Sequence, residues 1–324
     1  MTYEPIKLTD LLDGPTEVTW IMEPFIPPTS TVLLAGRSGV GKTWLSLDIA
    51  LSIVSGIPWL GQFPVQQGPV LIVDEENSEL LLRIRLLQLL HSYALSPRDL
   101  PLYTLIGKMI NLSPTKLAGG FNESYDGLLK AIYQVEPVLV IFDSLTRCHR
   151  ANENSANEMA AMFANVKHLI DETGTSCLFN HHFRKGGGGS NRSGDRIRGS
   201  TDIRAFCDVT LLMDSNDNGV TVTHDKSRWS EPIPSFAVDF QSDDDAFALS
   251  YAGEASKKED KQQQAWEWLQ EALDDGPLGR KQLIDQRKGV CSIRALDDTL
   301  KWRWENGFLE KEREGHHVVY SLTD

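Results

Sequence analysis

Short apolar runs alternate with longer segments of helical period over most of the chain. The runs are of strand length and rich in β-branched residues, which is typical of strands buried on both faces of a sheet. They predict strands at residues 31–35, 70–73, 138–142, 176–180 and 208–213. The intervening segments predict helices at residues 42–54, 78–94, 123–134 and 155–173. Strands that alternate with helices predict an α/β domain with a mainly parallel sheet.

The composition and the hydrophobic pattern of the chain change near residue 253. Residues 253–263 are polar and lack an apolar period, which is typical of a linker. The part that follows predicts three helices and a hairpin, at residues 260–274, 279–288, 292–306, 308–312 and 317–322. Two late strands are expected before the linker, at residues 220–223 and 235–240. We therefore predict one domain over residues 1–252 and a smaller one over residues 264–324.

Composition and charge narrow the classes of function. Hydrophobic residues make up 41% of the 324 residues and charged residues 24%, which is typical of a globular protein. The net charge of −13 excludes a uniformly basic coat for nucleic acid, so that such a contact has to be a local patch. No apolar run approaches the ~20 residues that cross a bilayer, and the first residues do not resemble a secretion signal. Four dispersed cysteines are typical of a reducing compartment, so we expect a cytoplasmic protein without a membrane partner.

Residues 36–43, GRSGVGKT, match the phosphate-binding pattern G-x-x-x-x-G-K-[ST] between a predicted strand and a predicted helix. Glycines let the backbone turn its N–H groups toward phosphate oxygens, and the helix N-terminus adds partial positive charge. Lys42 can reach the β- and γ-phosphates, and the Thr43 hydroxyl can bind Mg²⁺. We expect ATP and Mg²⁺ at this loop, with nucleotide contacts from Gly36, Ser38, Gly39, Val40, Gly41, Lys42, Thr43 and Trp44.

Two other predicted strands end in acidic residues. Asp143 follows one of them and is predicted as the second Mg²⁺-binding residue. The segment DEEN at residues 74–77 follows the other, at the sheet edge where α/β proteins bind ligands. One of its carboxylates could polarise the attacking water as a general base, and we favour Glu75 over Glu76. The alternative is that this segment caps the next helix.

Basic residues follow later strands. His182 ends one strand and can donate a hydrogen bond to a γ-phosphate, although a histidine there is often only a satisfied polar group. Lys226 and Arg228 point the same way on an extended segment, and could act as fingers on a neighbouring subunit's phosphates or form a solvated turn. The glycine-rich loop after His182 suits a nucleic-acid backbone, with a solvated surface loop as the alternative. Its cations are Arg184, Lys185, Arg192, Arg196 and Arg198.

These motifs, in this order, resemble the RecA-like core of the RepA-type hexameric helicase ATPases, with RadA, DnaB and KaiC as more distant relatives. The stretches that carry the resemblance span roughly residues 15–245 and read LLAGRSGVGKTWLSLDIALSI, VLIVDEENSELLLRIRLL, LVIFDSLTR, NHHFRKGGGG, RIRGSTDIRAFCDVTLLM and HDKSRWSEP. The resemblance implies Glu75 as base, Asp143 at the metal, and His182 as a sensor of γ-phosphate or DNA. It also implies Lys226 and Arg228 as K-x-R fingers, with Arg198 as a further interface residue.

The segment after the linker looks like a winged-helix domain, which is outside the helicase core pattern. After position 255 the chain has 12 basic and 14 acidic residues, which is less basic than usual for a helix that reads DNA. A replication-protein partner is therefore as reasonable as DNA for this domain.

The resemblance implies a homo-oligomeric ring, often a hexamer, that hydrolyses ATP and acts on single-stranded DNA as a replicative helicase of a mobile element. The alternatives are an ATP-driven loader or regulator, a RadA-like recombination or repair filament, and a P-loop kinase.

Overall fold

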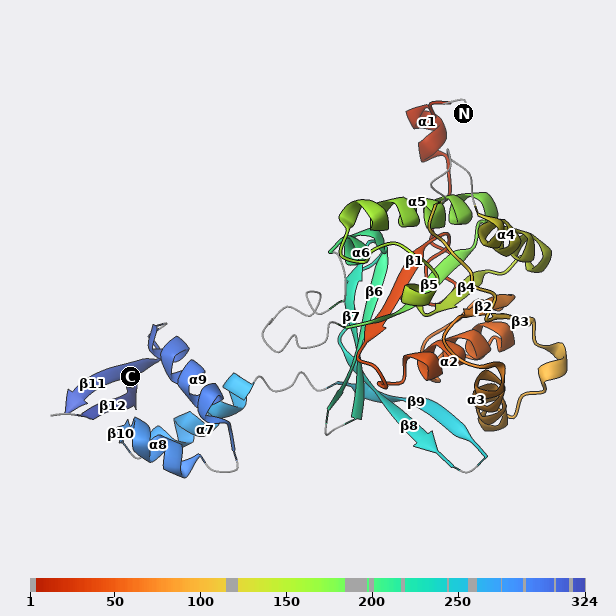
Figure 1. Ribbon diagram of the computed structural model, residues 1–324. Coiled ribbons are helices and arrows are strands. Elements are labelled where there is room, and N and C mark those ends of the chain that lie inside the picture. Colours follow the sequence, from red (N-terminus) through yellow and green to blue (C-terminus); the bar gives the residue numbers. More distant parts are fainter. Residues whose placement is uncertain are drawn as a thin grey trace. The chain divides into compact units, whose positions relative to one another are not determined.

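The computed structural model describes residues 4–114, 122–183, 197, 201–216, 219–243, 245–255, 261–274, 276–287, 290–305, 307–314 and 317–323. The chain forms two compact units, residues 1–253 and 254–324 (Figure 1). Within the described part of the chain, no helix has both the length and the apolarity to cross a membrane.

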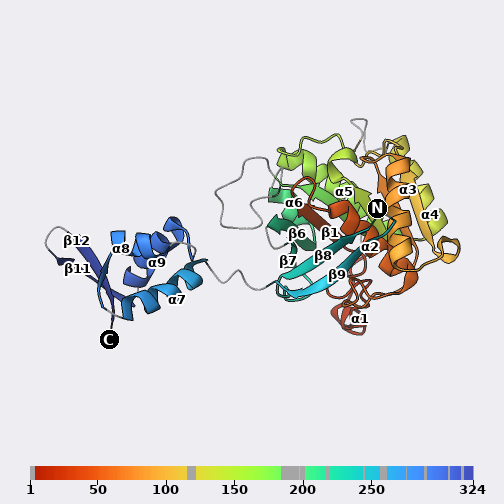
Figure 2. The same ribbon diagram turned by 90° about the horizontal axis from the view of Figure 1, so that it is seen from below.

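The first unit is built on a nine-stranded sheet in the order β3-β2-β4-β5-β1-β6-β7-β8-β9. Its strands from β3 to β6 in this order pair in parallel, whereas β6, β7 and β8 pair antiparallel. Figure 2 shows β7, β8 and β9 following one another. The strands are β1 (Thr31–Gly36), β2 (Val70–Asp74), β3 (Leu102–Ile106), β4 (Leu139–Asp143), β5 (Ser176–His182), β6 (Val209–Asn216), β7 (Gly219–Ser227), β8 (Phe236–Ser242) and β9 (Phe247–Glu254). The predicted α/β class with a mostly parallel sheet is confirmed, and it is consistent with a RecA-like core.

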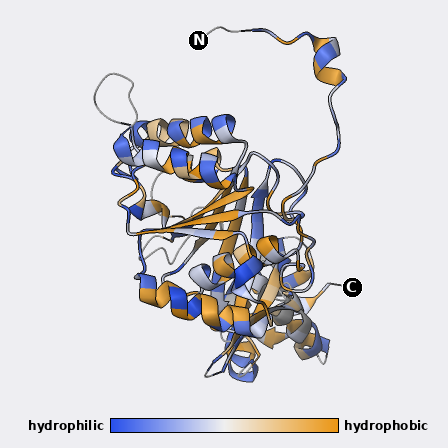
Figure 3. Ribbon diagram, turned by 90° about the vertical axis from the view of Figure 1, so that its right-hand side faces the viewer, coloured by the Kyte–Doolittle hydropathy of each residue, from blue (hydrophilic) through white to orange (hydrophobic). Residues whose placement is uncertain are grey.

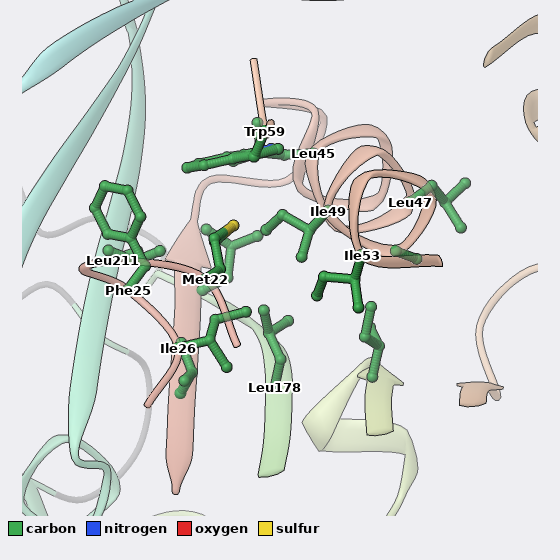
Figure 4. Close-up of a cluster of buried hydrophobic side chains, with 14 of the residues drawn as sticks. Met22, Phe25, Ile26, Leu45, Leu47, Ile49, Ile53, Trp59, Leu178 and Leu211 are labelled. Atoms are coloured by element: carbon green, nitrogen blue, oxygen red, sulfur yellow. The ribbon is translucent and has the colours of Figure 1, made fainter. Parts of the chain in front are cut away.

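Helices cover both faces of this sheet, because alternate residues of each buried strand point to opposite faces. Val32 and Leu34 of β1 join the core under α2, whereas Leu33 and Ala35 join the core under α4 and α5. Figure 3 shows the apolar strands between these layers, and Figure 4 shows the core on the α2 side. The helices are α1 (Leu8–Leu12), α2 (Lys42–Ser55), α3 (Glu79–Ser92), α4 (Glu123–Val135), α5 (Ala156–Thr173) and α6 (Thr201–Phe206), with short 3₁₀ turns at Pro97–Asp99 and Leu145–Arg147.

Strands β3 and β9 are absent from the set predicted from the sequence. β3 is an edge strand whose five residues are all partly or fully exposed, so it lacks the continuous apolar run of a buried strand. β9 runs to Glu254 and therefore extends into the polar segment that the sequence assigns to the linker from residue 253. Propensity and periodicity are weakest at such half-exposed edges.

The second unit has its own core and its own sheet. Its elements are α7 (Lys261–Asp274), β10 (Leu278–Gly279), α8 (Arg280–Gln286), α9 (Ile293–Glu305), β11 (Leu309–Glu314) and β12 (His317–Leu322). The strands form an antiparallel sheet in the order β10-β12-β11. Leu269, Leu283, Leu296 and Leu300 are buried between the helices and this sheet. The three helices and the hairpin lie close to their predicted positions, and β10 is an addition.

Candidate functional site

The glycine loop follows β1, the middle strand of the nine-stranded sheet. Gly36 ends β1 and pairs in register with His182 of β5 and with Met213 of β6. A Cβ atom at Gly36 would lie 2.8 Å from the Met213 carbonyl oxygen, so only glycine fits there. Gly41 has a φ of 100° and is the N-cap of α2, which is the left-handed conformation that favours glycine. The sequence therefore folds the loop tightly at the N-terminus of a 14-residue helix, where the helix dipole favours anions.

Lys42 holds its ammonium group over its own loop. The Nζ atom donates to the carbonyl oxygens of Gly36, at 3.2 Å, and Arg37, at 2.9 Å. Burial lowers the pKa of Lys42, and the negative charges of Asp143 and Glu76 oppose that shift. An ammonium held by main-chain carbonyls can exchange them for phosphate oxygens without unfolding anything around it.

Thr43 and Asp143 form a pair that can bind a hard cation. The Thr43 hydroxyl donates to Asp143 Oδ2 at 2.7 Å. Burial raises the pKa of Asp143, and Asp74, its register partner on β2, adds to that shift. No group of three or more histidine, cysteine, aspartate or glutamate side chains gathers as a metal site within the described ranges. A hydroxyl and a carboxylate are oxygen ligands of the kind that Mg²⁺ takes, with phosphate and water completing its shell.

The structure separates the two candidate bases. The Glu75 carboxylate accepts hydrogen bonds from the backbone N–H groups of Lys108, Met109 and Ile110, at 3.0–3.1 Å. Glu75 therefore fastens the chain after β3, and its oxygens are engaged away from the glycine loop. Glu76 instead has its Oε2 atom 3.8 Å from Nε2 of His182. The geometry thus brings Glu76 to the loop, although the sequence favours Glu75.

Hydrogen bonds to Asp74 explain why Glu76, and not Glu75, reaches the glycine loop. Its Oδ1 atom accepts from the backbone N–H groups of Glu76, at 3.0 Å, and Asn77, at 2.8 Å. These bonds close a tight turn after β2, and Ser78 then caps α3 by accepting from the N–H of Leu81. The cap that the sequence offers as an alternative is therefore supplied by Ser78, directly after the acidic segment, whereas Asp74 shapes the turn before it.

His182 lies between the lysine and the glutamate. Its Nδ1 atom is 3.4 Å from Lys42 Nζ, on the side opposite to Glu76. A neutral ring with its proton on Nε2 can accept from Lys42 and donate toward Glu76. Interaction with the His182 ring is the largest cause that lowers the pKa of Glu76, to about 2. Glu76 therefore stays ionised in ordinary conditions, as a hydrogen-bond acceptor for water.

Lys226 and Arg228 lie elsewhere, at the opposite end of β1. Lys226 Nζ donates to the carbonyl oxygens of Arg204, Ala205 and Cys207, which close the C-terminus of α6. Arg228 donates to Asp208 Oδ1 at 3.0 Å and to the carbonyl oxygen of Ala205 at 2.7 Å. Asp208 in turn accepts from the N–H of Thr31, the first residue of β1. Six strand residues, or roughly 16–20 Å, separate this place from the glycine loop of the same chain.

Of the remaining predicted residues, the structure describes those near the glycine loop but not the cations of the basic loop. Ser38 is exposed and Val40 is buried within the loop. The Trp44 ring stacks on Phe247 with centroids 3.8 Å apart, and Arg85 lies 5.5 Å above it, so this side chain joins α2 to β9 and α3. The loop cations lie outside the described residues and are Arg184, Lys185, Arg192, Arg196 and Arg198.

Asn180 is a site neighbour that the sequence analysis missed. Its Nδ2 atom donates to the Ser46 hydroxyl at 3.0 Å, which ties β5 to α2 behind the loop. An asparagine directly after the apolar residues 177–179 of a predicted strand is the signal that could have found it.

A family model described as an AAA domain matches residues 3–188. The match covers more than half of the 324 residues and includes the glycine loop, the acidic segment, Asp143 and His182. It ends before Lys226 and Arg228. The geometry of the loop and the match agree, and the chain therefore belongs to the AAA-domain family of P-loop ATPases.

Proposed function

We propose that this protein is a Mg²⁺-dependent ATPase that forms a ring of identical copies, a hexamer, and moves along single-stranded DNA as a RepA-like replicative helicase. The observation that carries the ATPase part is the convergence of Lys42, Thr43, Asp143, Glu76 and His182 at one edge of the sheet. These side chains supply a phosphate ligand, a metal-binding pair, an ionised acceptor and a polar contact between them.

The chemistry follows from these side chains. Lys42 exchanges the carbonyls of Gly36 and Arg37 for phosphate oxygens of ATP. Thr43 and Asp143 would hold Mg²⁺, which would neutralise charge on the phosphates. The Glu76 carboxylate would accept a hydrogen bond from the attacking water and take its proton as the water oxygen bonds to the γ-phosphorus. The bond from the γ-phosphorus to the oxygen that bridges it to the β-phosphorus breaks in the same step, and ADP leaves with that oxygen. His182 contacts both Lys42 and Glu76. Its hydrogen bonds would therefore change when the γ-phosphate is lost, which is the sensor role.

Assembly is supported by the position of Lys226 and Arg228. Transfer of a γ-phosphoryl group is typically accelerated by a cation aimed at the developing charge. In its own chain Arg228 is separated from the loop by the length of β1. A neighbouring copy that places this end of its sheet against the loop would supply the cation, which is a head-to-tail contact that closes into a ring.

Action on DNA is supported by where the basic loop is attached. Phe183 and Ile197 pair as an antiparallel bridge, and both side chains are buried. The sequence between them starts two residues after His182 and carries Arg184, Lys185, Arg192 and Arg196. Contacts of these cations with a DNA backbone would therefore act next to the residue that contacts Lys42 and Glu76.

The second unit favours a protein partner. We propose that it is a winged-helix domain with α9 in the recognition position. Its cations are partly neutralised, because Arg280 donates to both carboxylate oxygens of Asp297 and Arg294 pairs with Asp298 at 3.8 Å. A replication protein is thus a better match than DNA for this face, and a loader that unwinds nothing is the second candidate function.

Three assays distinguish a helicase from a loader, a filament-forming protein and a kinase. We expect ATP hydrolysis that rises with single-stranded DNA, and loss of that rise in the triple variant Arg184→Ala, Lys185→Ala, Arg192→Ala. A matched control removes cations elsewhere, with Lys130→Ala and Arg150→Ala. A helicase displaces a paired strand, whereas a loader hydrolyses ATP without displacement. Electron microscopy distinguishes rings from filaments, and full activity in a monomer would return the kinase alternative.

A further inference from the structure

A groove in the second unit lies between α9 and the antiparallel sheet. It has a volume of about 330 Å³, at the small end of the range for ligand sites. The residues of α9 that line it are Asp297, Leu300, Lys301 and Trp304. Their spacing of i, i+3, i+4 and i+7 places them on one face of the helix. The facing wall is formed by Lys311 of β11 and Tyr320 of β12, which are register partners. The groove is therefore sized for a short stretch of a partner and not for a folded surface.

Two aromatic rings form the apolar part of this groove. Trp304 is 44% exposed, so that much of its ring is open to a ligand. Tyr320 is partly buried and packs against the core of the second unit, to which the buried Leu300 belongs. Tryptophan and tyrosine side chains are enriched among the residues that supply most of the binding energy at protein contacts. The groove thus offers an apolar contact for one side chain of a partner.

The groove is positively charged, although the second unit is acidic on balance. Arg280, also in the groove, donates to both carboxylate oxygens of Asp297, at 2.7 and 2.8 Å, so these two charges neutralise each other. The Nζ atom of Lys311 lies 4.4 Å from the centroid of the Trp304 ring. Among the residues that the structure describes, neither Lys301 nor Lys311 forms an ion pair with a carboxylate. Two ammonium groups therefore remain for the anions of a ligand.

We propose that this groove binds an acidic peptide segment of a partner protein, in which carboxylates lie next to one apolar side chain. The carboxylates would pair with Lys301 and Lys311, and the apolar side chain would pack on Trp304 and Tyr320. The inference rests on the proposed protein partner of the second unit, and it names the chemistry by which that partner is recognised.

Single-stranded nucleic acid also combines anions with rings, but the groove suits it less well. A phosphate backbone typically follows a row of cations, with its bases stacked on successive aromatic side chains. The two unpaired lysines lie at one place, and α9 also exposes the carboxylates of Asp298 and Glu305. A nucleic acid that crossed α9 would approach these carboxylates, whereas a short peptide can stay within the groove.

Fluorescence anisotropy with the full chain tests the proposal. The probe is a fluorescein-labelled synthetic peptide, Asp-Asp-Asp-Ala-Phe, and its matched controls are Asn-Asn-Asn-Ala-Phe and Asp-Asp-Asp-Ala-Gly. We expect saturable binding of the probe and binding of each control that is weaker by about tenfold or more, because each control lacks one half of the recognised chemistry.

Variants of the chain assign the binding to the groove. Lys301→Glu, Lys311→Glu is expected to weaken binding of the probe about tenfold or more. Its matched control, Lys281→Glu, Arg294→Glu, makes the same change of charge at exposed positions outside the groove and should bind as the unmodified chain does. Trp304→Ala should bind the peptides that end in Phe and in Gly equally, while it still prefers aspartate to asparagine. Circular dichroism checks the fold of each variant.

Several results would overturn the proposal. These are the absence of peptide binding, equal binding of the aspartate and asparagine probes, and equal weakening by the two double variants. Binding of a labelled oligothymidylate that depends on Lys301 and Lys311, without binding of the peptide, would assign the groove to nucleic acid instead. ATP hydrolysis and strand displacement by the unmodified chain separate this inference from the proposed function. An active helicase that does not bind the peptide removes the groove alone, whereas an inactive protein that binds it removes the helicase alone.

Discussion

The two ends of β1 each carry a lysine whose ammonium rests on main-chain carbonyls. At the C-terminal end Lys42 contacts Gly36 and Arg37, and at the N-terminal end Lys226 contacts the last turn of α6. The residues that we propose for catalysis, Glu76, His182 and the Thr43–Asp143 pair, surround the first lysine. Among the described residues, the hydrogen bonds of the second lysine hold the C-terminus of α6. The comparison teaches that most of the proposed hydrolytic site lies at one end of β1, and that a second pair of cations, Lys226 and Arg228, lies at the other.

The largest expected effect is at the C-terminal end of β1, where the glycine loop lies. Lys42→Ala removes the phosphate ligand, so we expect ATP hydrolysis to fall by about a thousandfold or more. Phosphate release measures it, and circular dichroism checks the fold. Wild-type turnover in this variant would show that the glycine loop is not the site.

The second prediction concerns the two glutamates. Glu76→Gln keeps the size of the side chain but removes the acceptor for the proton of water, so we expect hydrolysis to fall about a hundredfold or more. Glu75→Gln is the matched control. It weakens the anchor to residues 108–110 and is expected to lower thermal stability more than the rate. The reverse ranking of the two rates would return the role of base to Glu75.

The third prediction concerns Arg228, one of the two cations at the N-terminal end of β1. Arg228→Ala should cost less than about 1 kcal/mol of stability, because its pair with Asp208 is half-exposed. We expect hydrolysis by the assembled protein to fall at least about tenfold. Rates measured at equal, low temperature separate the two effects. A loss that parallels unfolding would leave Arg228 with a structural role only.

The smallest effect is expected at Asp48, in the helix α2 that follows the glycine loop. Burial raises the pKa of this carboxyl to about 7, while its Oδ1 accepts from the Tyr93 hydroxyl at 2.7 Å. The folded state keeps the proton that the unfolded chain releases near its usual pKa of 3.8, so stability falls as the pH rises toward 7. Asp48→Asn should raise the melting temperature at pH 8 by a few degrees, less at pH 5, with hydrolysis unchanged. An equal gain at both pH values would contradict this.

The sequence predicts the features that depend on local pattern. The run from β1 through the glycine loop into α2 is contiguous, so its strand, turn and helix are all legible from residues 31–54. The choice between Glu75 and Glu76 is different, because it depends on the turn closed by Asp74 and on N–H groups more than thirty residues away. The partners of Lys226 and Arg228 are likewise set by α6 and Asp208, which no spacing within residues 225–228 reveals.

The central claim is that the cations at one end of β1 complete the site at the other end in a neighbouring copy. Its most direct measurement mixes Lys42→Ala with Arg228→Ala, each expected to be nearly inactive alone. A trans site predicts that the 1:1 mixture recovers ATP hydrolysis, to about a quarter of the wild-type rate, since random assembly pairs an intact loop with an intact arginine at that frequency. A mixture that assembles but stays as inactive as its components would contradict the account.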